Sequence, residues 1–513
     1  MPIPYLSRFE EASRAYVEGA CAVIEAIRAR GHVGLFVGGF VRDLLLGRPA
    51  VEIDLATSMP LEEIQATFPD TVAVGRPFGV LVVLHQGHPY TLSVFRTETG
   101  YRDGRHPDQV AYVAEFAEDA RRRDFTINGL GMTLEGEILD PVGGRADLEV
   151  GVIRAIGDPA ARVAEDRLRM LRAVRFVAQL GFRVDPETEQ AIRDGASEIT
   201  QVSAERIHAE LDKLLVAAHR ERAFRMLHAV GLLRAILPEV EAMVGVQQSP
   251  EYHPEGDVFE HTARALGLLS PQASLRAAWG LLLHDVGKPV TYVYDVHKGR
   301  ESFYRHEEVG EELAAEIATR LRFSARDREA VCWLVRHHLR VARLLEMRPA
   351  RAKRLLADPL FPDLLEVFKA DIASTGRTGE KVLAFVARER GGAVVETQRR
   401  LITGADLIAL GYAPGPAFGA MLQEVQDLAL EGRLSTREAA LRYVQEHHPL
   451  PRGAGDPPGD PAHPPIPGGG EAGRLAGPGV AQEARCPQCG FTMRLVAAFY
   501  RCGNCGFKES CCY

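Results

Sequence analysis

The chain has 513 residues, of which 46% are hydrophobic and 25% are charged, and its formal net charge is −8 at pH 7. This length exceeds what one hydrophobic core supports, so the sequence predicts several domains with an ordinary globular composition. The acidic balance excludes a chain that binds nucleic acid over its whole surface, and any RNA-binding surface must be local. No apolar run is long enough to span a membrane, and the acidic residues near Met1 argue against a signal or transit peptide.

A glycine pair near the start of the chain lies between two predicted elements. An amphipathic helix is predicted over residues 7–30, followed by a short buried strand at residues 35–37. Residues 40–46 have helical spacing, which places Gly38 and Gly39 at a strand-to-helix turn. Because glycine lets the backbone turn sharply and approach a ligand, free N–H groups at this turn can hold a phosphate.

A second predicted strand, over residues 51–55, carries two acids. Side chains alternate across a strand, so Glu52 and Asp54 should lie on the same face. Two carboxylates beside an anion-binding turn are what two-metal phosphoryl or nucleotidyl transfer requires. The alternative is an ordinary glycine turn and two solvated acids at a sheet edge.

The combination of GGFVRD, an acid-x-acid strand and ATS resembles the signature of class II tRNA nucleotidyltransferases (CCA-adding enzymes) and bacterial poly(A) polymerases. The resemblance implies an α/β, polymerase-β-like head in which Glu52 and Asp54 are catalytic and hold Mg²⁺. It also implies that Gly38, Gly39 and Arg42 cradle the triphosphate of the nucleotide.

Two positions depart from the family pattern. The family usually has Asp-x-Asp, whereas the first acid here is Glu52. A third acid usually stands where this chain has Thr91, on a strand predicted over residues 90–95. These departures predict a transferase of reduced activity that depends on Asp54.

Two later blocks extend the resemblance. RRRDFTINGL is similar to the family block RRDFTxNA, which implies that Arg123 and Asp124 contact the incoming nucleotide. EDRLRMLRAVRF, residues 165–176, is predicted to be helical with Asp166 and Arg169 on one face. In the family these two side chains select C and A at the Watson–Crick edge of the base, and the resemblance implies the same role here. The alternative is an ion pair within the helix, worth about 0.3–0.5 kcal/mol.

A later helical region carries a series of histidines and acids. WGLLLHDVGKP resembles the HD phosphohydrolase superfamily, and HPEGDVFEH upstream resembles the start of the HD appendage in some bacterial CCA-adding enzymes. A lone histidine is more often a core residue than a ligand, but this series follows the order of the superfamily's metal ligands. The resemblance implies one divalent ion, such as Mn, Ni or Fe, and a second ion held with His306 and either His337 or His338. The predicted HD-site ligands are His261, His284, Asp285, His306, His338 and Asp371.

The C-terminal part combines a Pro/Gly-rich linker with a cysteine motif. Four cysteines in the pattern CxxC-x12-CxxC predict two chelating knuckles that form a structural Zn²⁺ site. The pattern is not a disulfide framework, so it indicates a metal site and a reducing, cytoplasmic location. The predicted zinc ligands are Cys486, Cys489, Cys502 and Cys505.

The predicted architecture is an α/β nucleotidyltransferase (polymerase-β-like) head followed by all-α neck, body and HD domains and a small C-terminal zinc ribbon. The predicted segments are a head (1–155), a neck and body for nucleotide selection and tRNA binding (156–245), an HD domain (246–395), a helical tail (396–448), a flexible linker (449–484) and the zinc ribbon (485–513).

The resemblance implies that the protein adds or repairs the 3′-terminal CCA of tRNA from CTP and ATP, with no membrane partner. An A-adding or poly(A) polymerase remains open, as does an HD phosphohydrolase with a catalytically weakened RNA-binding head. The sequence leaves the oligomeric state open.

Overall fold

The computed structural model describes residues 11–49, 52–75, 79–100, 109–251, 253–254, 256–297 and 299–450, with three short strands between residues 493 and 510. The chain divides into two compact units, Met1–Val341 with Pro362–Gly379, and Ala342–Phe361 with Glu380–Tyr513. Within the described residues, no helix is both long enough and apolar enough to cross a membrane.

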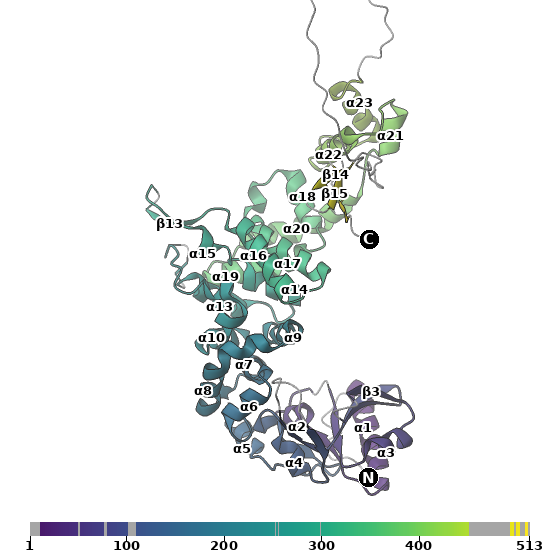
Figure 1. The fold of residues 1–513 in the computed structure, drawn as a ribbon. Coiled ribbons are helices and arrows are strands. Elements are labelled where there is room, and N and C mark those ends of the chain that lie inside the picture. The colour runs from purple at the N-terminus through teal and green to yellow at the C-terminus, as the bar shows by residue number, and fades with distance from the viewer. Residues whose placement is uncertain are drawn as a thin grey trace, which may run out of the picture. The chain divides into compact units, whose positions relative to one another are not determined.

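The first unit begins with a head built on a seven-stranded sheet (Figure 1). The strand order is β3-β4-β5-β2-β1-β8-β9. Helix α1 (Glu11–Ala29) packs against β1, β2, β4 and β5, and α2 (Gly39–Leu45) follows β1 directly. The strands of this sheet are β1 Gly34–Val37, β2 Asp54–Thr57, β3 Thr71–Gly75, β4 Val80–His85, β5 His88–Val94, β8 Gly131–Met132 and β9 Ile138–Leu139.

The register of the central strands brings the acids to the glycine turn. Strand β2 is antiparallel to β1, with Asp54 opposite Val37, and parallel to β5, with Asp54 opposite Thr91. Because Val37 immediately precedes Gly38, Asp54 lies beside the predicted turn. The strand begins at Asp54, so Glu52 precedes it rather than lying within a strand over residues 51–55.

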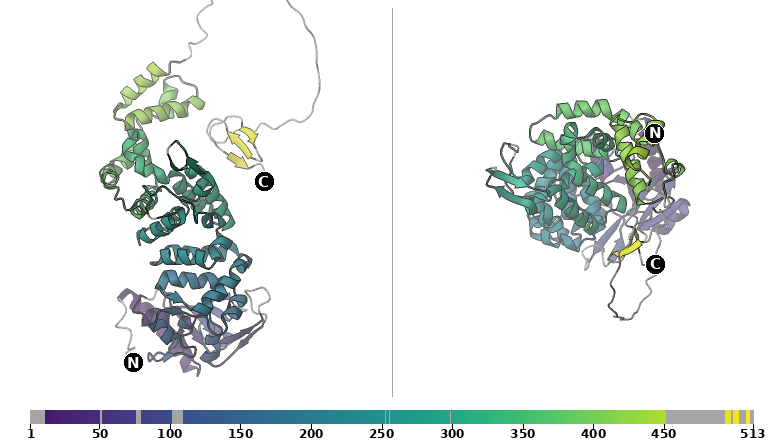
Figure 2. Two further views of the ribbon diagram at one scale, coloured as in Figure 1. Left: turned by 90° about the vertical axis from the view of Figure 1, so that its left-hand side faces the viewer. Right: turned by 90° about the horizontal axis from the view of Figure 1, so that it is seen from above.

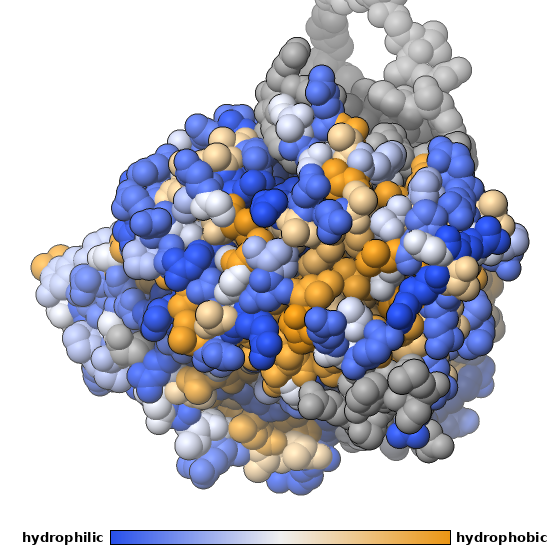
Figure 3. Space-filling model, turned by 90° about the horizontal axis from the view of Figure 1, so that it is seen from below, coloured by the Kyte–Doolittle hydropathy of each residue, from blue (hydrophilic) through white to orange (hydrophobic). Residues whose placement is uncertain are grey.

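Smaller elements complete the head and its junction with the neck. They are α3 Leu61–Thr67, β6 Arg96–Thr99, β7 Gln109–Tyr112, α4 Phe116–Arg121, the 3₁₀ helix η3 Thr126–Asn128, α5 Gly144–Glu149 and β10 Val152–Ile153. In the view of Figure 3, hydrophobic residues gather near the middle, among hydrophilic residues that predominate around them.

The neck differs from the sequence prediction at one point. Residues 165–176 do not form one helix, because α6 (Pro159–Glu165) ends and α7 (Leu168–Leu180) begins on either side of Asp166. The Asp166 backbone is extended, and its carboxylate accepts the Leu168 N–H at 3.1 Å. A short acidic side chain competes for backbone donors in this way and favours a helix start over a helix interior.

The remaining neck elements pack around α7. The neighbours include α9 and α10, which both contact α7. The elements are β11 Arg183–Val184, α8 Pro186–Gly195, the 3₁₀ helix η4 Ala196–Gln201, α9 Ala204–Leu215, α10 Arg220–Ala229, α11 Leu232–Ile236 and α12 Pro238–Glu241.

One hydrophobic core continues through the first unit, from the head into the helices that follow. It contains Phe36 of the sheet, Leu171 of α7 and Trp279 of α14, all buried. The HD region adds a hairpin that projects from the helices (Figures 1 and 2). Its elements are α13 Val258–Leu268, α14 Leu275–Leu283, α15 Lys288–Thr291, β12 Tyr292–Asp295, β13 Arg300–Phe303, α16 His306–Arg320, α17 Ala325–His337, the 3₁₀ helix η5 His338–Glu346 and α19 Phe361–Ser374.

The second unit is helical over its larger described part, as the sequence predicts for residues 396–448. Leu407, Met421 and Val444 belong to its hydrophobic core. Its helices are α18 Pro349–Ala357, α20 Glu380–Gln398, α21 Gly404–Ala409, α22 Pro416–Leu430 and α23 Arg437–His447.

The segment predicted to be a zinc ribbon contains a three-stranded antiparallel sheet. Its strands are β14 Met493–Val496, β15 Phe499–Cys502 and β16 Lys508–Ser510, in the order β14-β15-β16. Cys486, Cys489 and Cys505 lie outside the described residues, and only the backbone of Cys502 is described. The zinc site therefore stays a prediction.

Candidate functional site

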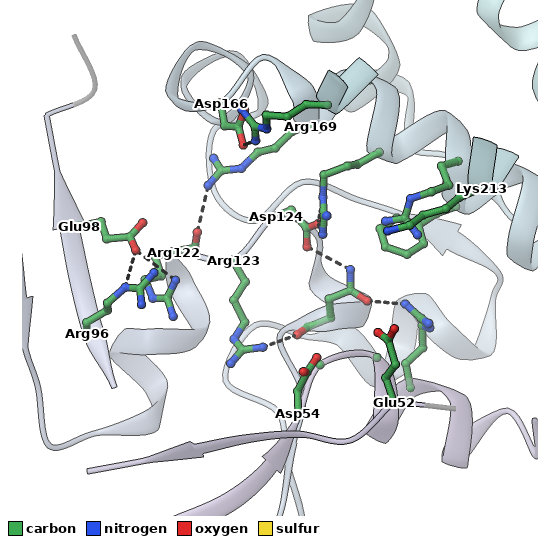
Figure 4. Close-up of a pocket in the computed structure, with 18 residues that line it drawn as sticks. Glu52, Asp54, Arg96, Glu98, Arg122, Arg123, Asp124, Asp166, Arg169 and Lys213 are labelled. Atoms are coloured by element: carbon green, nitrogen blue, oxygen red, sulfur yellow. Dashed lines mark hydrogen bonds and ion pairs between the residues drawn. The ribbon is translucent and has the colours of Figure 1, made fainter. Parts of the chain in front are cut away.

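The residues predicted for the transferase site line one cleft of about 630 Å³ in the first unit, here called the transferase cleft (Figure 4). In this view Glu52 and Asp54 lie at one side, and Asp166 and Arg169 lie at the other. The predicted residues that line it are Gly38, Gly39, Arg42, Glu52, Asp54, Arg123, Asp124, Asp166 and Arg169.

The two acids point into this cleft. Glu52 is exposed and Asp54 is partly buried, and neither makes a hydrogen bond or ion pair with another described residue. Burial raises the pKa of Asp54; the positive charge of Arg123 opposes this shift, and the negative charge of Glu52 adds to it. Two neighbouring carboxylates fit a site for divalent cations, which would relieve their repulsion.

Glycine is required at the turn itself. Gly38 has a φ of 67°, and a Cβ there would lie 3.2 Å from Arg123 Nη1. Its N–H donates to the Leu130 carbonyl at 3.1 Å, so this N–H already has a partner in the protein. Any anion at the turn would therefore rely on later N–H groups and on arginine side chains.

A chain of polar contacts joins the head to the neck across the cleft. Arg42 Nη1 donates to Asn128 Oδ1 at 2.8 Å, and Asn128 Nδ2 donates to Asp124 Oδ1 at 3.0 Å. Arg172 of α7 then donates to Asp124 Oδ2 through Nε at 2.9 Å and Nη2 at 2.6 Å. Although burial alone would raise the pKa of Asp124, Arg172 and hydrogen bonds from Asn128 and the Phe125 N–H hold it well below its usual range. Asp124 is thus an ionised anchor between the two parts.

Asp166 and Arg169 line the cleft but are held by other residues. Asp166 Oδ2 accepts from Arg206 Nη2 at 2.9 Å, and Arg169 Nη1 donates to Glu165 Oε2 at 2.5 Å. Among the described contacts the two side chains do not pair with each other, although the Arg169 N–H donates to the Asp166 carbonyl at 2.9 Å, so the predicted alternative of an ion pair between them is not present. Their polar atoms are fixed in position, as a base-reading pair would need.

Several cleft residues were missed by the sequence reasoning. The guanidinium carbons of Arg42, Arg172 and Arg175 lie 5.2, 5.8 and 4.1 Å from the centroid of the Phe176 ring. This positive wall suits a polyphosphate. The three-residue spacing of arginines in LRMLRAVRF could have indicated it. The lining residues that were not predicted as site residues are Arg96, Glu98, Arg122, Asn128, Arg172, Arg175, Phe176, Arg206 and Lys213.

The predicted HD ligands come together in a second site, here called the metal-ligand cluster, which consists of His261, His284, Asp285, His306, His338 and Asp371. It contains two groups that share one carboxylate. Asp285 Oδ2 is 3.2 Å from His284 Nε2, and Oδ1 is 3.4 Å from His306 Nε2. The Nε2 atoms of His261 and His284 are 3.2 Å apart, as are those of His306 and His338.

The contacts of the other ring nitrogen, Nδ1, indicate how these histidines are protonated. Nδ1 of His284, His306 and His338 lies 2.6, 2.9 and 2.7 Å from backbone carbonyl oxygens. A carbonyl only accepts, so Nδ1 carries a proton, and in a neutral imidazole this leaves the Nε2 lone pair for a metal ion. Burial is the main cause that lowers the pKa of His338 to about 3, which keeps its imidazole neutral. Neutral imidazoles with converging lone pairs fit two divalent ions that share Asp285.

The structure also shows which of the two adjacent candidates, His337 and His338, belongs to the cluster. The ring of His337 stacks on Trp333, and its Nδ1 faces the Trp333 carbonyl at 2.9 Å. His338 lies in the cluster instead.

Comparison with known families finds three matches in chain order. The Poly A polymerase head domain matches residues 35–154, and the "Probable RNA and SrmB- binding site of polymerase A" matches residues 181–244. The HD domain family matches residues 258–374. The first match contains the glycine turn and both acids, and the third contains the metal-ligand cluster.

Individual proteins of known identity are also similar to this chain. The CCA-adding enzyme of Lactiplantibacillus plantarum is 46% identical over 205 residues, which are 40% of this chain and 50% of that protein. The CCA-adding enzyme of Lactobacillus johnsonii is 32% identical over 439 residues, which are 84% of this chain and 97% of that protein. The crystal structure of the Bacillus stearothermophilus CCA-adding enzyme in complex with CTP superposes with a TM-score of 0.66 at 27% identity, covering 85% of this chain and 98% of that one. The chain thus belongs to the CCA-adding enzyme family.

Proposed function

We propose that the protein adds or repairs the 3′-terminal CCA of tRNA, using CTP and ATP. In each step the tRNA 3′ oxygen forms a bond to the α-phosphorus of the nucleotide, and the bond to pyrophosphate breaks. The hydroxyl proton passes to solvent. The observation that carries this proposal is the pair of acids opposite an arginine-lined wall, in a chain that aligns with nearly all of a CCA-adding relative.

The cleft residues have separate roles in this proposal. Mg²⁺ bound by Glu52 and Asp54 would activate the 3′ hydroxyl and neutralise the triphosphate. Arg42 and Arg123 contribute fixed positive charge beside the acids, where the phosphates would lie. Across the cleft, the Asp166 carboxylate offers acceptors and the Arg169 guanidinium offers donors to the edge of the base.

The test uses tRNA that lacks CCA, with CTP and ATP supplied separately and together. Stepwise addition of C, C and A is the expected result. Extension with ATP alone would select an A-adding or poly(A) polymerase. No extension, together with metal-dependent release from phosphoesters, would select a hydrolase with a weakened head.

The metal-ligand cluster supports a second activity, the hydrolysis of phosphoesters. Two ions of the Mn, Ni or Fe type would supply Lewis acidity and an activated water there. The water oxygen forms the new bond to phosphorus, and the ester oxygen leaves with a proton. Lys288 Nζ lies 2.7 Å from Asp285 Oδ2 and donates to Gln248 Oε1 at 2.6 Å, so it fixes the shared carboxylate in place.

The C-terminal cysteines are proposed to hold structural Zn²⁺. Their spacing supplies four thiolates, and a segment this small needs a metal to fold stably. Zinc content of the full chain, compared with that of the Cys486→Ser/Cys489→Ser variant, tests this proposal. A loss of one equivalent is expected, and equal content would refute it.

A further inference from the structure

The β12–β13 hairpin, residues 292–303, lies directly beside the metal-ligand cluster. Its strands pair antiparallel, with Tyr292 opposite Phe303 and Tyr294 opposite Glu301. Directly opposed residues lie on the same face, so both tyrosines share a face with Phe303. Figure 1 shows this hairpin projecting beyond α15 and α16.

Direct contacts link the hairpin to the cluster. The Phe303 carbonyl accepts from Nδ1 of His306, one of the cluster ligands, at 2.9 Å. The Phe303 ring also lies 5.3 Å from Nζ of Lys288, which is paired with Asp285. A cavity of about 350 Å³ is lined both by cluster residues and by residues 300–304. The second strand of the hairpin is therefore a wall of the candidate hydrolytic site.

The outer part of this wall is aromatic and open to solvent. Tyr292, Tyr294 and Tyr304 are 43, 52 and 55% exposed. The Tyr292 ring meets Phe303 edge-on at 5.8 Å, which continues the aromatic surface towards the cavity. These exposed rings contribute little to the hydrophobic core. Exposed aromatic rings beside a phosphate site are the means by which proteins hold successive bases without reading their sequence.

We infer that the substrate of the metal-ligand cluster is a phosphoester in a single-stranded nucleic acid, whose neighbouring bases stack on Tyr292 and Tyr294. This inference rests on the proposed hydrolytic function of the cluster. Once a phosphate occupies the cavity, nucleotides further along the strand come within reach of the tyrosines. A small phosphoester has no base to reach them, so the hairpin favours longer substrates.

The kinetic test compares a short and a long substrate on the Mn²⁺-loaded full chain. The substrates are bis(p-nitrophenyl) phosphate and a single-stranded oligoribonucleotide of about ten nucleotides. In Tyr292→Ala/Tyr294→Ala the ratio of kcat/KM for the long over the short substrate should fall about tenfold, mainly through KM. Tyr292→Phe/Tyr294→Phe should restore the ratio, because phenylalanine keeps the stacking face. Tyr112→Ala, which removes an exposed tyrosine of the head, is the matched control and should keep the ratio. An unchanged ratio in the double alanine variant would overturn the inference.

A second measurement does not depend on hydrolysis. Photo-crosslinking of a 4-thiouridine oligonucleotide to the wild-type chain should label a peptide that contains residues 290–304. Such labelling without any hydrolysis would contradict the proposed hydrolase but support binding at the hairpin. Labelling confined to other peptides would contradict the inference. The inference would also be wrong if another protein, or a second copy of this chain, covered the hairpin and excluded the oligonucleotide.

Discussion

The transferase cleft and the metal-ligand cluster both gather acids for divalent ions, but their side chains differ in burial and in how firmly hydrogen bonds hold them. In the cleft Glu52 is exposed and Asp54 is partly buried, and both project into open space. In the cluster His261, His284 and Asp285 are no more than 2% exposed, and each imidazole is oriented by a hydrogen bond on its far side.

This difference follows from what each site must bind. A cluster of buried ligands is organised by packing before any substrate arrives, so it can hold resident ions. The cleft has to admit a nucleotide and an RNA end, and its carboxylates stay accessible for ions that can arrive with the triphosphate. Substitutions in the two sites should therefore separate two activities.

The largest expected effect is in the cleft. Asp54→Ala should abolish nucleotide addition, because the carboxylate beside the glycine turn is lost, while metal-dependent hydrolysis persists. Incorporation of labelled CTP into tRNA that lacks CCA measures the first activity, and the release of p-nitrophenol measures the second. Asp70→Ala, an exposed acid of the same domain, is the control. Wild-type addition by Asp54→Ala would show that the head is not catalytic.

The reciprocal experiment substitutes a residue of the metal-ligand cluster. His284→Ala should abolish metal-stimulated hydrolysis and leave nucleotide addition largely intact, and a chelator should affect the wild-type hydrolase in the same way. His337→Ala is the matched control, since His337 stacks on Trp333 outside the cluster. Equal loss of both activities in His284→Ala would mean that the cluster maintains the fold instead.

A third prediction tests the anchor between head and neck. Asp124→Asn removes a charged partner of Arg172 and should lower the stability by about 1.5–3 kcal/mol, measured by urea unfolding. Because the pKa of Asp124 is held down in the folded protein, its stabilising effect is present above its unfolded pKa, about 4, and is lost as the pH falls below that value. The wild type should therefore lose its advantage over Asp124→Asn on acidification. An advantage that persists at low pH would contradict the ionised anchor.

The expected loss of base selection is comparable in free energy to the loss of stability in Asp124→Asn. Arg169→Ala removes the donors that are proposed to read the base, which should reduce discrimination between CTP and ATP by about 1.5–3 kcal/mol. The ratio of kcat/KM for the two nucleotides measures this effect. Arg193→Ala, an exposed helical arginine of the neck, is the control. Unchanged discrimination in a folded Arg169→Ala variant would leave this arginine a purely structural role with Glu165.

The smallest expected effect is at Glu52. Glutamate carries its carboxylate one methylene further out than aspartate, and a misplacement of about 1 Å in a reacting group can cost on the order of a hundredfold in rate. The extra torsion recovers part of that loss, so Glu52→Asp should raise the rate of nucleotide addition modestly. A lower rate would show that the longer acid is an adapted ligand beside Thr91.

The amino-acid sequence is enough to predict the order of the elements and the chemistry that each one carries. Apolar runs and glycines located β1, the turn and α2 within a residue or two, and the resemblance to family motifs indicated Glu52, Asp54 and the cluster ligands. The strand, turn and helix are local features, because a strand or helix fixes the directions of its own side chains.

Which residues meet across elements depends on the three-dimensional packing of the chain. It placed Asp166 outside the helix and beside Arg206, joined Asp124 to Arg172, and put His338 rather than His337 into the cluster. These pairs are tens of residues apart or depend on the end of a helix, where periodicity carries no information. Their choice follows from the packing of the head sheet against the neck and of the HD helices against one another, which sequence spacing alone does not encode.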